Sequence, residues 1–184
     1  MNGYTAARDV GVRTARWLAK INGRGPLQQV LQVVAKPAEE LAEVLAAMAA
    51  GDFDGAVAEC CDVVFTARTA QATIGQPAWL LRDDRMPEAR EAPDAHGGVE
   101  VAQRLLTQAV AELGGVAIAW MGQNPRKLAA NGGTLPVEVV SDRLDEVVHL
   151  ACQMIRALGH DADQALLEDA ARVHHRLDGL EVPR

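Results

Sequence analysis

The chain has 184 residues, which allows one large domain or two small ones. Its net charge of −7 at pH 7 argues against a nucleic-acid scaffold, which usually carries a basic face. No apolar run reaches the roughly 18–20 residues that a membrane-spanning helix needs, and no segment resembles a signal peptide. We therefore expect neither nucleic acid nor a membrane as a partner.

Helix-forming residues dominate the chain, and β-branched runs between turns are scarce, which predicts an all-α fold. Pro37 lies inside the second predicted helix and indicates a kink or a restart there, with Pro37 near the first helical position. A charged, proline-bearing stretch at 82–98 is typical of a linker or of a short helix leading into one, and a polar loop is expected at 123–135. Helices are expected at about 6–21, 27–50, 56–74, 99–121, 136–158 and 162–177.

The two halves of the chain resemble each other. Glu40 matches Glu112 at an offset of 72 residues, and Gly75 matches Gly159 at an offset of 84, each within a longer similar segment. Alanine- and valine-rich helices can look alike by chance, but the shared glycine break favours an internal duplication. We therefore expect two tandem helical repeats, packed as a pseudo-dimeric helix bundle and covering 1–90 and 91–184.

Acidic residues gather in two consecutive predicted helices joined by a short turn. Residues three or four positions apart share a helix face, so an antiparallel pair can bring the two acidic faces together. No Lys or Arg interrupts these acids between Lys36 and Arg68, whereas exposed helices ordinarily place a base three or four positions from Glu. The acids of this group are Glu39, Glu40, Glu43, Glu59 and Asp62.

Such a group has three outcomes: it splays into solvent, it protonates, or it holds a cation. Two like charges about 4 Å apart cost roughly 4 kcal/mol at an effective dielectric constant near 20. A whole domain is stable by only about 5–15 kcal/mol, so converging carboxylates need a compensating charge. Oxygen ligands without His or Cys favour Mg²⁺ or Mn²⁺ over zinc. An ordinary solvated helix surface is the alternative.

The pattern Glu39-Glu40-x-x-Glu43, followed after a gap by Glu59-x-x-Asp62, resembles the signature of the MazG-like all-α nucleoside triphosphate pyrophosphohydrolases. The resemblance covers about residues 12–75, and the second half is similar to a degenerate copy. It implies that four acids from two helices bind Mg²⁺, with Mn²⁺ as a substitute, and that the enzyme converts a nucleoside triphosphate (NTP or dNTP) to a monophosphate and pyrophosphate.

Residue roles follow from the same resemblance. The metal ligands would be Glu40, Glu43, Glu59 and Asp62, and Glu39 would be an accessory ligand or would orient the attacking water. The family's distal phosphate-contacting Asn and Lys have no clear counterpart after the first repeat. Phosphate or base contacts are instead expected from bases outside the acidic group, each of which is more often a solvated surface residue. These are Lys36, Arg68, Arg85, Arg126 and Lys127.

In the second half only two of the five acids remain, so a second metal site is not expected. Arg143 occupies the position equivalent to Glu59 and is expected to neutralise Glu112 and Glu146. The family usually works as dimers, so a homodimer in addition to the internal pseudo-dimer is compatible with this chain. A basic group on the last helix is interpreted as favourable charge at a helix C-terminus; it comprises Arg172, His174, His175 and Arg176.

The three cysteines show no zinc spacing, which indicates reduced core thiols and a cytoplasmic location. Two alternatives to the pyrophosphohydrolase stay open. One is a catalytically silent helical module that binds a nucleotide or a protein. The other is a related helical phosphohydrolase that would use the same metal site on another nucleotide.

Overall fold

The computed structural model describes residues 2–23, 25–75, 95–121 and 137–180. All regular structure in these ranges is helical and no strand occurs there, so the predicted all-α class is confirmed. Most of the predicted linker at 82–98 and the whole predicted loop at 123–135 lie outside the described residues. The elements are α1 (Gly3–Asn22), α2 (Pro26–Val30), the π-helical turn η1 (Leu31–Ala35), α3 (Lys36–Ala50), α4 (Phe53–Thr73), α5 (Ala95–Met121), α7 (Val137–Ala157) and α8 (Ala162–Leu180).

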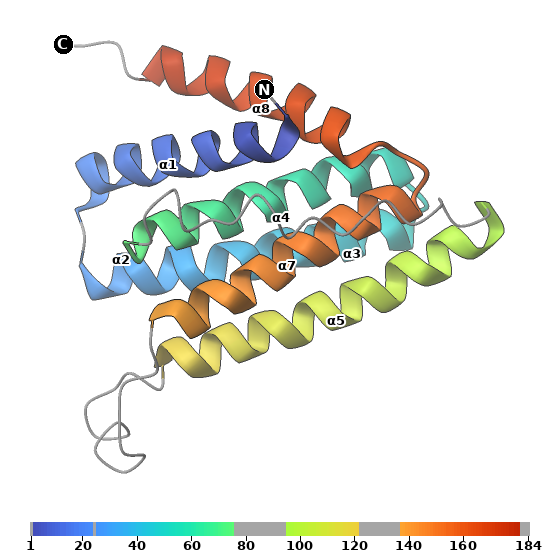
Figure 1. Ribbon diagram of the computed structural model, residues 1–184, viewed down its shortest axis with the longest axis horizontal. Helices are drawn as coiled ribbons and strands as arrows, with labels where there is room; N and C mark the ends of the chain where they lie inside the picture. Colours follow the sequence, from blue (N-terminus) through green and yellow to red (C-terminus); the bar gives the residue numbers. More distant parts are fainter. Residues whose placement is uncertain (1, 24, 76–94, 122–136, 181–184) are drawn as a thin grey trace.

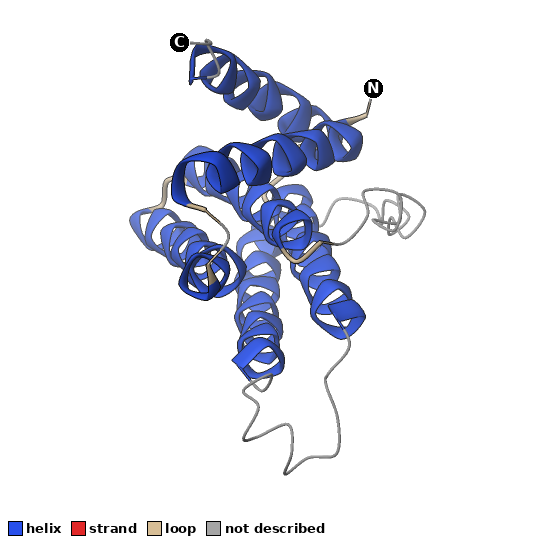
Figure 2. Cartoon of the chain, turned by 90° about the vertical axis from the view of Figure 1, so that its left-hand side faces the viewer, coloured by secondary structure: helices blue, strands red, loops and turns tan. Residues whose placement is uncertain are grey.

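Helix α4 is the centre of the arrangement. It packs against α3, α7 and α1 and, less extensively, against α8, while α5 packs along α7 (Figure 1). The pairs α3–α4 and α5–α7 are each antiparallel, whereas α1 and α8 run in the same direction and cover the other pairs from one side (Figure 2). None of the described helices combines the length and apolarity that crossing a bilayer requires.

One aliphatic core runs through both halves of the chain. It contains Val44, Val63 and Val64 from α3 and α4 together with Leu144 and Ile155 from α7, all almost fully buried. Burying one such side chain is worth about 1.5–3 kcal/mol, so the many small aliphatic residues compensate for the scarcity of aromatic ones. The three cysteines are buried free thiols, as expected.

The α3–α4 hairpin is fixed by its two-residue connection. Gly51 adopts a left-handed conformation (φ 74°) that ends α3, and the Asp52 side chain caps α4 by accepting a hydrogen bond from the Gly55 N–H at 2.8 Å. So short a connection returns the chain antiparallel. The acid-bearing faces of α3 and α4 therefore lie side by side.

Pro37 is accommodated by the π-turn that precedes it. The Lys36 N–H donates to the Leu31 carbonyl, five residues back, which widens the helix just before the proline. In an α-helix the proline ring would clash with the carbonyl four residues earlier, and the wider turn relieves this clash. The α-helix restarts at Lys36 with Pro37 in its first turn, as the sequence predicts.

Helices α1 and α8 are held together at both ends of their contact. The Gly3 N–H donates to the Asp163 carboxylate at 2.7 Å, and Arg13 bonds His174 and the Asp178 carboxylate, the latter at 2.7 Å. A Cβ atom on Gly3 would lie 2.3 Å from the Asp163 carbonyl oxygen, so only glycine permits this approach. The contact fixes where α8 lies relative to α4.

Candidate metal centre

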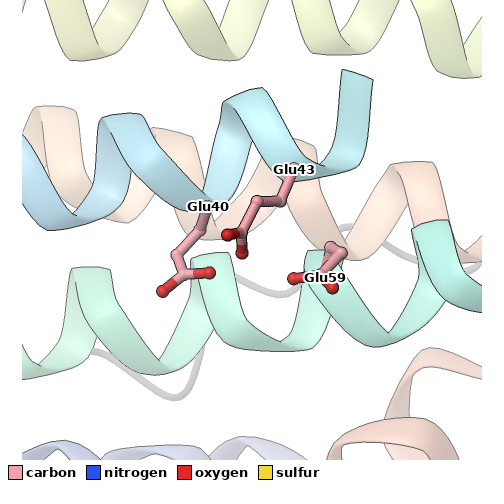
Figure 3. Close-up of side chains that lie close together, drawn as sticks. All are labelled: Glu40, Glu43 and Glu59. Carbon is pink, nitrogen blue, oxygen red and sulfur yellow. The ribbon is translucent and has the colours of Figure 1, made fainter. Parts of the chain in front are cut away.

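Three carboxylates meet between α3 and α4. Glu40 and Glu43 project from α3 towards Glu59 of α4, and one carboxylate oxygen from each lies within 4.8 Å of those of the other two (Figure 3). Glu40 is 4% exposed, Glu59 is half-buried and Glu43 is exposed. The cluster therefore has a buried inner end and an open outer end.

Burial and neighbouring acids raise the pKa values of two of these carboxyls, Glu40 and Glu59. Burial raises the pKa of Glu40 to about 7, against the lowering effect of Lys36, and a hydrogen bond with Glu43 and the charge of Asp62 raise it further. The pKa of Glu59 is also raised, first by burial and then by Glu43 and Asp62. Positive charge at this position would stabilise the ionised forms.

Lys36 supplies part of that charge. Its Nζ atom lies 2.6 Å from a Glu40 carboxylate oxygen and 3.1 Å from one of Glu39. Burial alone would lower the pKa of Lys36, but the hydrogen bonds to Glu40 and Glu39 outweigh this and leave it raised. Glu39 is exposed and lies outside the carboxylate trio. The first predicted acid thus pairs with Lys36 at the rim.

Asp62, the remaining predicted ligand, is adjacent to the trio rather than part of it. It is half-buried on α4, and burial raises its pKa, while Arg176, Lys36 and Arg172 lower it and Glu43 raises it. Asp62 is therefore placed between the acids of α3 and the arginines of α8.

Arg68, a predicted phosphate contact, lies away from the carboxylates. It is 8% exposed, and its guanidinium donates to Asp145 of α7 at 2.5 Å and to Gln71 at 2.8 Å. Gln71 in turn donates to Ser141 on α7. The structure thus places Arg68 in a buried polar network that joins α4 to α7. Three other predicted phosphate or base contacts lie outside the described residues: Arg85, Arg126 and Lys127.

Sequence reasoning missed the approach of α8 to this site. Arg172 and Arg176 are four residues apart and share a helix face, and both influence Asp62. His174 faces the other way and bonds Arg13 of α1. The spacing of the two arginines was the only sequence signal for this approach. It could not be interpreted from the sequence, because it depends on how α8 packs against α4.

In the second half of the chain, an ion pair joins α5 and α7. Arg143 of α7 donates to a Glu112 carboxylate oxygen of α5 at 2.8 Å, which confirms that part of the expectation. The expected pairing with Glu146 is not present among the described residues. A Cβ atom on Gly115 would lie 2.4 Å from the Arg143 guanidinium, so the absence of a side chain at Gly115 makes room for the arginine.

The residues of the first-half cluster fit a hard divalent cation. All donors are carboxylate oxygens, which suit Mg²⁺ or Mn²⁺, and their number leaves coordination positions for water and substrate. Burial and, to a smaller extent, neighbouring acids raise the pKa values of Glu40 and Glu59, and a bound cation would oppose both effects. No protein-family model, curated protein or solved structure matches the chain.

Proposed function

We propose that the protein is a Mg²⁺-dependent pyrophosphohydrolase that converts a nucleoside triphosphate, NTP or dNTP, to a nucleoside monophosphate and pyrophosphate. The observation that supports this is the convergence of Glu40, Glu43 and Glu59 from two helices, with their oxygens within 4.8 Å of one another. The MazG-like motif Glu39-Glu40-x-x-Glu43 and Glu59-x-x-Asp62 supplies the reaction class.

In this proposal Glu40, Glu43, Glu59 and Asp62 hold the cation, with Mn²⁺ as a substitute. When bound, it would supply charge neutralisation for the phosphates and a water of lowered pKa. Glu39 lies at the rim, where it would accept a hydrogen bond from the attacking water. Attack of water at the α-phosphorus breaks the bond between that phosphorus and the bridging oxygen, and pyrophosphate leaves.

Lys36 has a second role in this scheme. Its ammonium group is bonded to Glu40 and Glu39 in the structure. Once another positive charge neutralises Glu40, the flexible Lys36 side chain can turn to a phosphate oxygen while remaining at the rim of the cluster. An ammonium group is a compact point charge that suits this exchange.

We also propose that the chain is a tandem of two MazG-like repeats, of which 1–90 keeps the metal motif and 91–184 is the degenerate copy. The paired packing of α3 with α4 and of α5 with α7 supports this pseudo-dimer. In the sequence, Glu40 of α3 matches Glu112 of α5 at an offset of 72 residues, which also supports the proposal. A cytoplasmic enzyme is proposed from the three free thiols, and a further homodimer is compatible with the arrangement.

One observation favours a second candidate, a catalytically silent module that binds a nucleotide or a protein. Lys36 already provides a cation for Glu40, so the cluster has a partial counter-charge of its own. In this alternative the acids and Lys36 stabilise the α3–α4 pair, and no turnover occurs.

The deciding experiment is pyrophosphate release from a panel of NTPs and dNTPs, with Mg²⁺ and with EDTA. We expect Mg²⁺-dependent release, lost by at least about a hundredfold in Glu43→Gln, which removes one metal-binding carboxylate at an exposed position. Glu146→Gln is the matched control, because Glu146 is exposed on α7 and should keep full activity. Absence of release from every nucleotide would refute the hydrolase and favour the silent module.

A further inference from the structure

A cleft lies between the second half of α1, the α2–η1 segment and the end of α4. Its volume is about 300 Å³, at the lower end of the range that small-molecule sites occupy. Figure 1 shows these three segments together at one end of the molecule, where α4 packs against both α1 and η1. None of the carboxylates of the metal cluster lines this cleft, so it is a separate feature that is large enough for a small organic ligand.

The lining of the cleft combines apolar walls with side-chain amides. The α1 and α4 sides contribute small apolar residues such as Ala15 and Ala72, and the α2–η1 side contributes Gln28, Gln29 and Gln32. The three glutamines are half-buried, and their side chains form no hydrogen bond with another residue that the structure describes. A carboxamide offers an acceptor and two donors next to each other. The cleft therefore presents unused donors and acceptors beside an apolar surface.

The charge of the lining narrows the class of ligand. Among the described residues the lining contains no Asp, Glu or Lys, and its charged residue, Arg16, is exposed at the rim. A cation would find no carboxylate there, and a run of phosphates would find only one solvated guanidinium. A wholly apolar ligand would leave the amides unpaired, which costs free energy. A neutral, planar heterocycle with donors and acceptors on its edge fits this lining, and the base of a nucleotide is such a ring.

The cleft also lies at a suitable separation from the carboxylate cluster. Gln32, Lys36 and Glu40 follow one another at spacings of four residues along η1 and α3. The eight residues from Gln32 to Glu40 correspond to about 12 Å along a helix axis. Lys36, which bonds Glu40, stands between the two along this run. A ribose and its first phosphate can bridge such a gap, so one nucleotide can reach both the cleft and the cluster.

We propose that this cleft binds the base of the substrate nucleotide and that Gln28 and Gln32 select the base. The two glutamines are four residues apart and share a face, and paired hydrogen bonds from an amide to a base edge distinguish one base from another. The inference deepens the proposed function and rests on it for the phosphates. Binding of the base itself needs no cation, because the cleft and the carboxylate cluster share no residue.

The test uses the full chain in EDTA, with the unphosphorylated nucleosides adenosine, guanosine, cytidine, uridine and thymidine as probes. Ligand-observed NMR detects binding in the millimolar range and requires neither metal nor turnover. We expect the preferred nucleoside to bind at least about tenfold more tightly than the weakest one. Gln28→Ala and Gln32→Ala should each weaken its binding about fivefold to tenfold. The matched control is Gln103→Ala, which changes an exposed glutamine of α5 and should leave binding unchanged.

Kinetics with the panel of NTPs and dNTPs give a second measurement. Gln32→Ala should lower kcat/KM for the preferred base about fivefold more than for the least preferred base, a change of selectivity that a merely structural role would not produce. Turnover with unchanged base selectivity and unchanged nucleoside binding in both glutamine variants would overturn the base site and leave the hydrolase intact. Glutamine-dependent binding of a nucleoside without turnover of any nucleotide would support the base site and refute the hydrolase. Absence of binding of all these nucleosides to the wild type would overturn the base site.

Discussion

Replacing Glu40 by Gln should stabilise the metal-free protein at neutral pH. In the folded chain burial raises the pKa of Glu40 to about 7 from its ordinary value of 4.5. A group whose pKa is raised by folding contributes stability below its unfolded pKa and loses it as the pH rises through the folded pKa. The difference corresponds to about 3 kcal/mol, lost between about pH 4.5 and about pH 7. Gln resembles the protonated carboxyl in shape and cannot ionise.

The assay is urea unfolding in EDTA at several pH values across this window, for the wild type, Glu40→Gln and the control Glu146→Gln. The free energy of unfolding of the wild type should fall relative to that of Glu40→Gln by about 3 kcal/mol as the pH rises from about 4.5 to about 8. The raised pKa values of Glu59 and Asp62 act in the same direction and remain in both proteins. Glu146→Gln should follow the wild type, because its side chain is exposed.

Mg²⁺ should act at the alkaline end of the same window. It binds the ionised carboxylates, so added Mg²⁺ should restore wild-type stability near pH 8 and have little effect near pH 4.5. Glu40→Gln should lose most of this effect. A free energy of unfolding of the wild type that stays level or rises relative to that of Glu40→Gln across the window would refute this account. Glu40 would then not be a buried carboxyl whose ionised form lacks a compensating cation.

Three further predictions concern the rest of the fold. Arg68→Met should lower the free energy of unfolding by about 3–5 kcal/mol, because it leaves Asp145 and Gln71 without their partner. Urea unfolding measures this loss, with Arg104→Met as the control variant. A loss below about 1 kcal/mol would contradict the prediction. Burial raises the pKa of Cys61 to about 12 and also raises the pKa values of Cys60 and Cys152. A thiol reagent at neutral pH should therefore react with no cysteine in the native protein and with three after denaturation. Rapid labelling of the native protein would contradict this and show that the core is open. Titration with Mn²⁺ should find metal at the first-half cluster only, and Arg143→Ala, which breaks a half-exposed pair, should cost about 0.2–1 kcal/mol without adding a second equivalent centre.

Periodicity and local rules were enough for the fold class and for the inner part of the site. The run from about Leu27 to Ala50 was expected as helix with a kink or a restart at Pro37. The structure confirms it, because the reason is local: proline lacks an N–H and collides with the preceding turn. The acidic faces that carry Glu40, Glu43 and Glu59 were expected to meet because a short turn makes the two helices antiparallel, and the structure brings the three carboxylates together. Neither conclusion required knowledge of distant contacts.

The environment of Asp62 and Arg68 could not be predicted in this way. Both lie on α4, which is packed against several helices, so a rotation of α4 by one residue, about 100°, decides which helix each side chain faces. Arg68 faces α7 and is buried with Asp145, whereas Asp62 faces the gap between α3 and α8. Helix spacing states that residues share a face but not which neighbour covers it. The part played by α8 depends on that same long-range packing.

The α3–α4 pair and the α5–α7 pair balance the charges between their helices in different ways. Under the proposed duplication, Arg143 and Gly115 stand at the positions of Glu59 and Glu43, and the ion pair of Arg143 with Glu112 needs nothing from outside the chain. In the first, Glu40, Glu43 and Glu59 remain acidic, and Lys36 alone cannot neutralise all of them. On the same proposal, an arginine removes such repulsion at position 143, whereas the first repeat retains it at Glu59 at a cost in stability. Retained repulsion of this kind is best explained by a ligand that uses it, and this is the physical basis for placing the chemistry in the first hairpin.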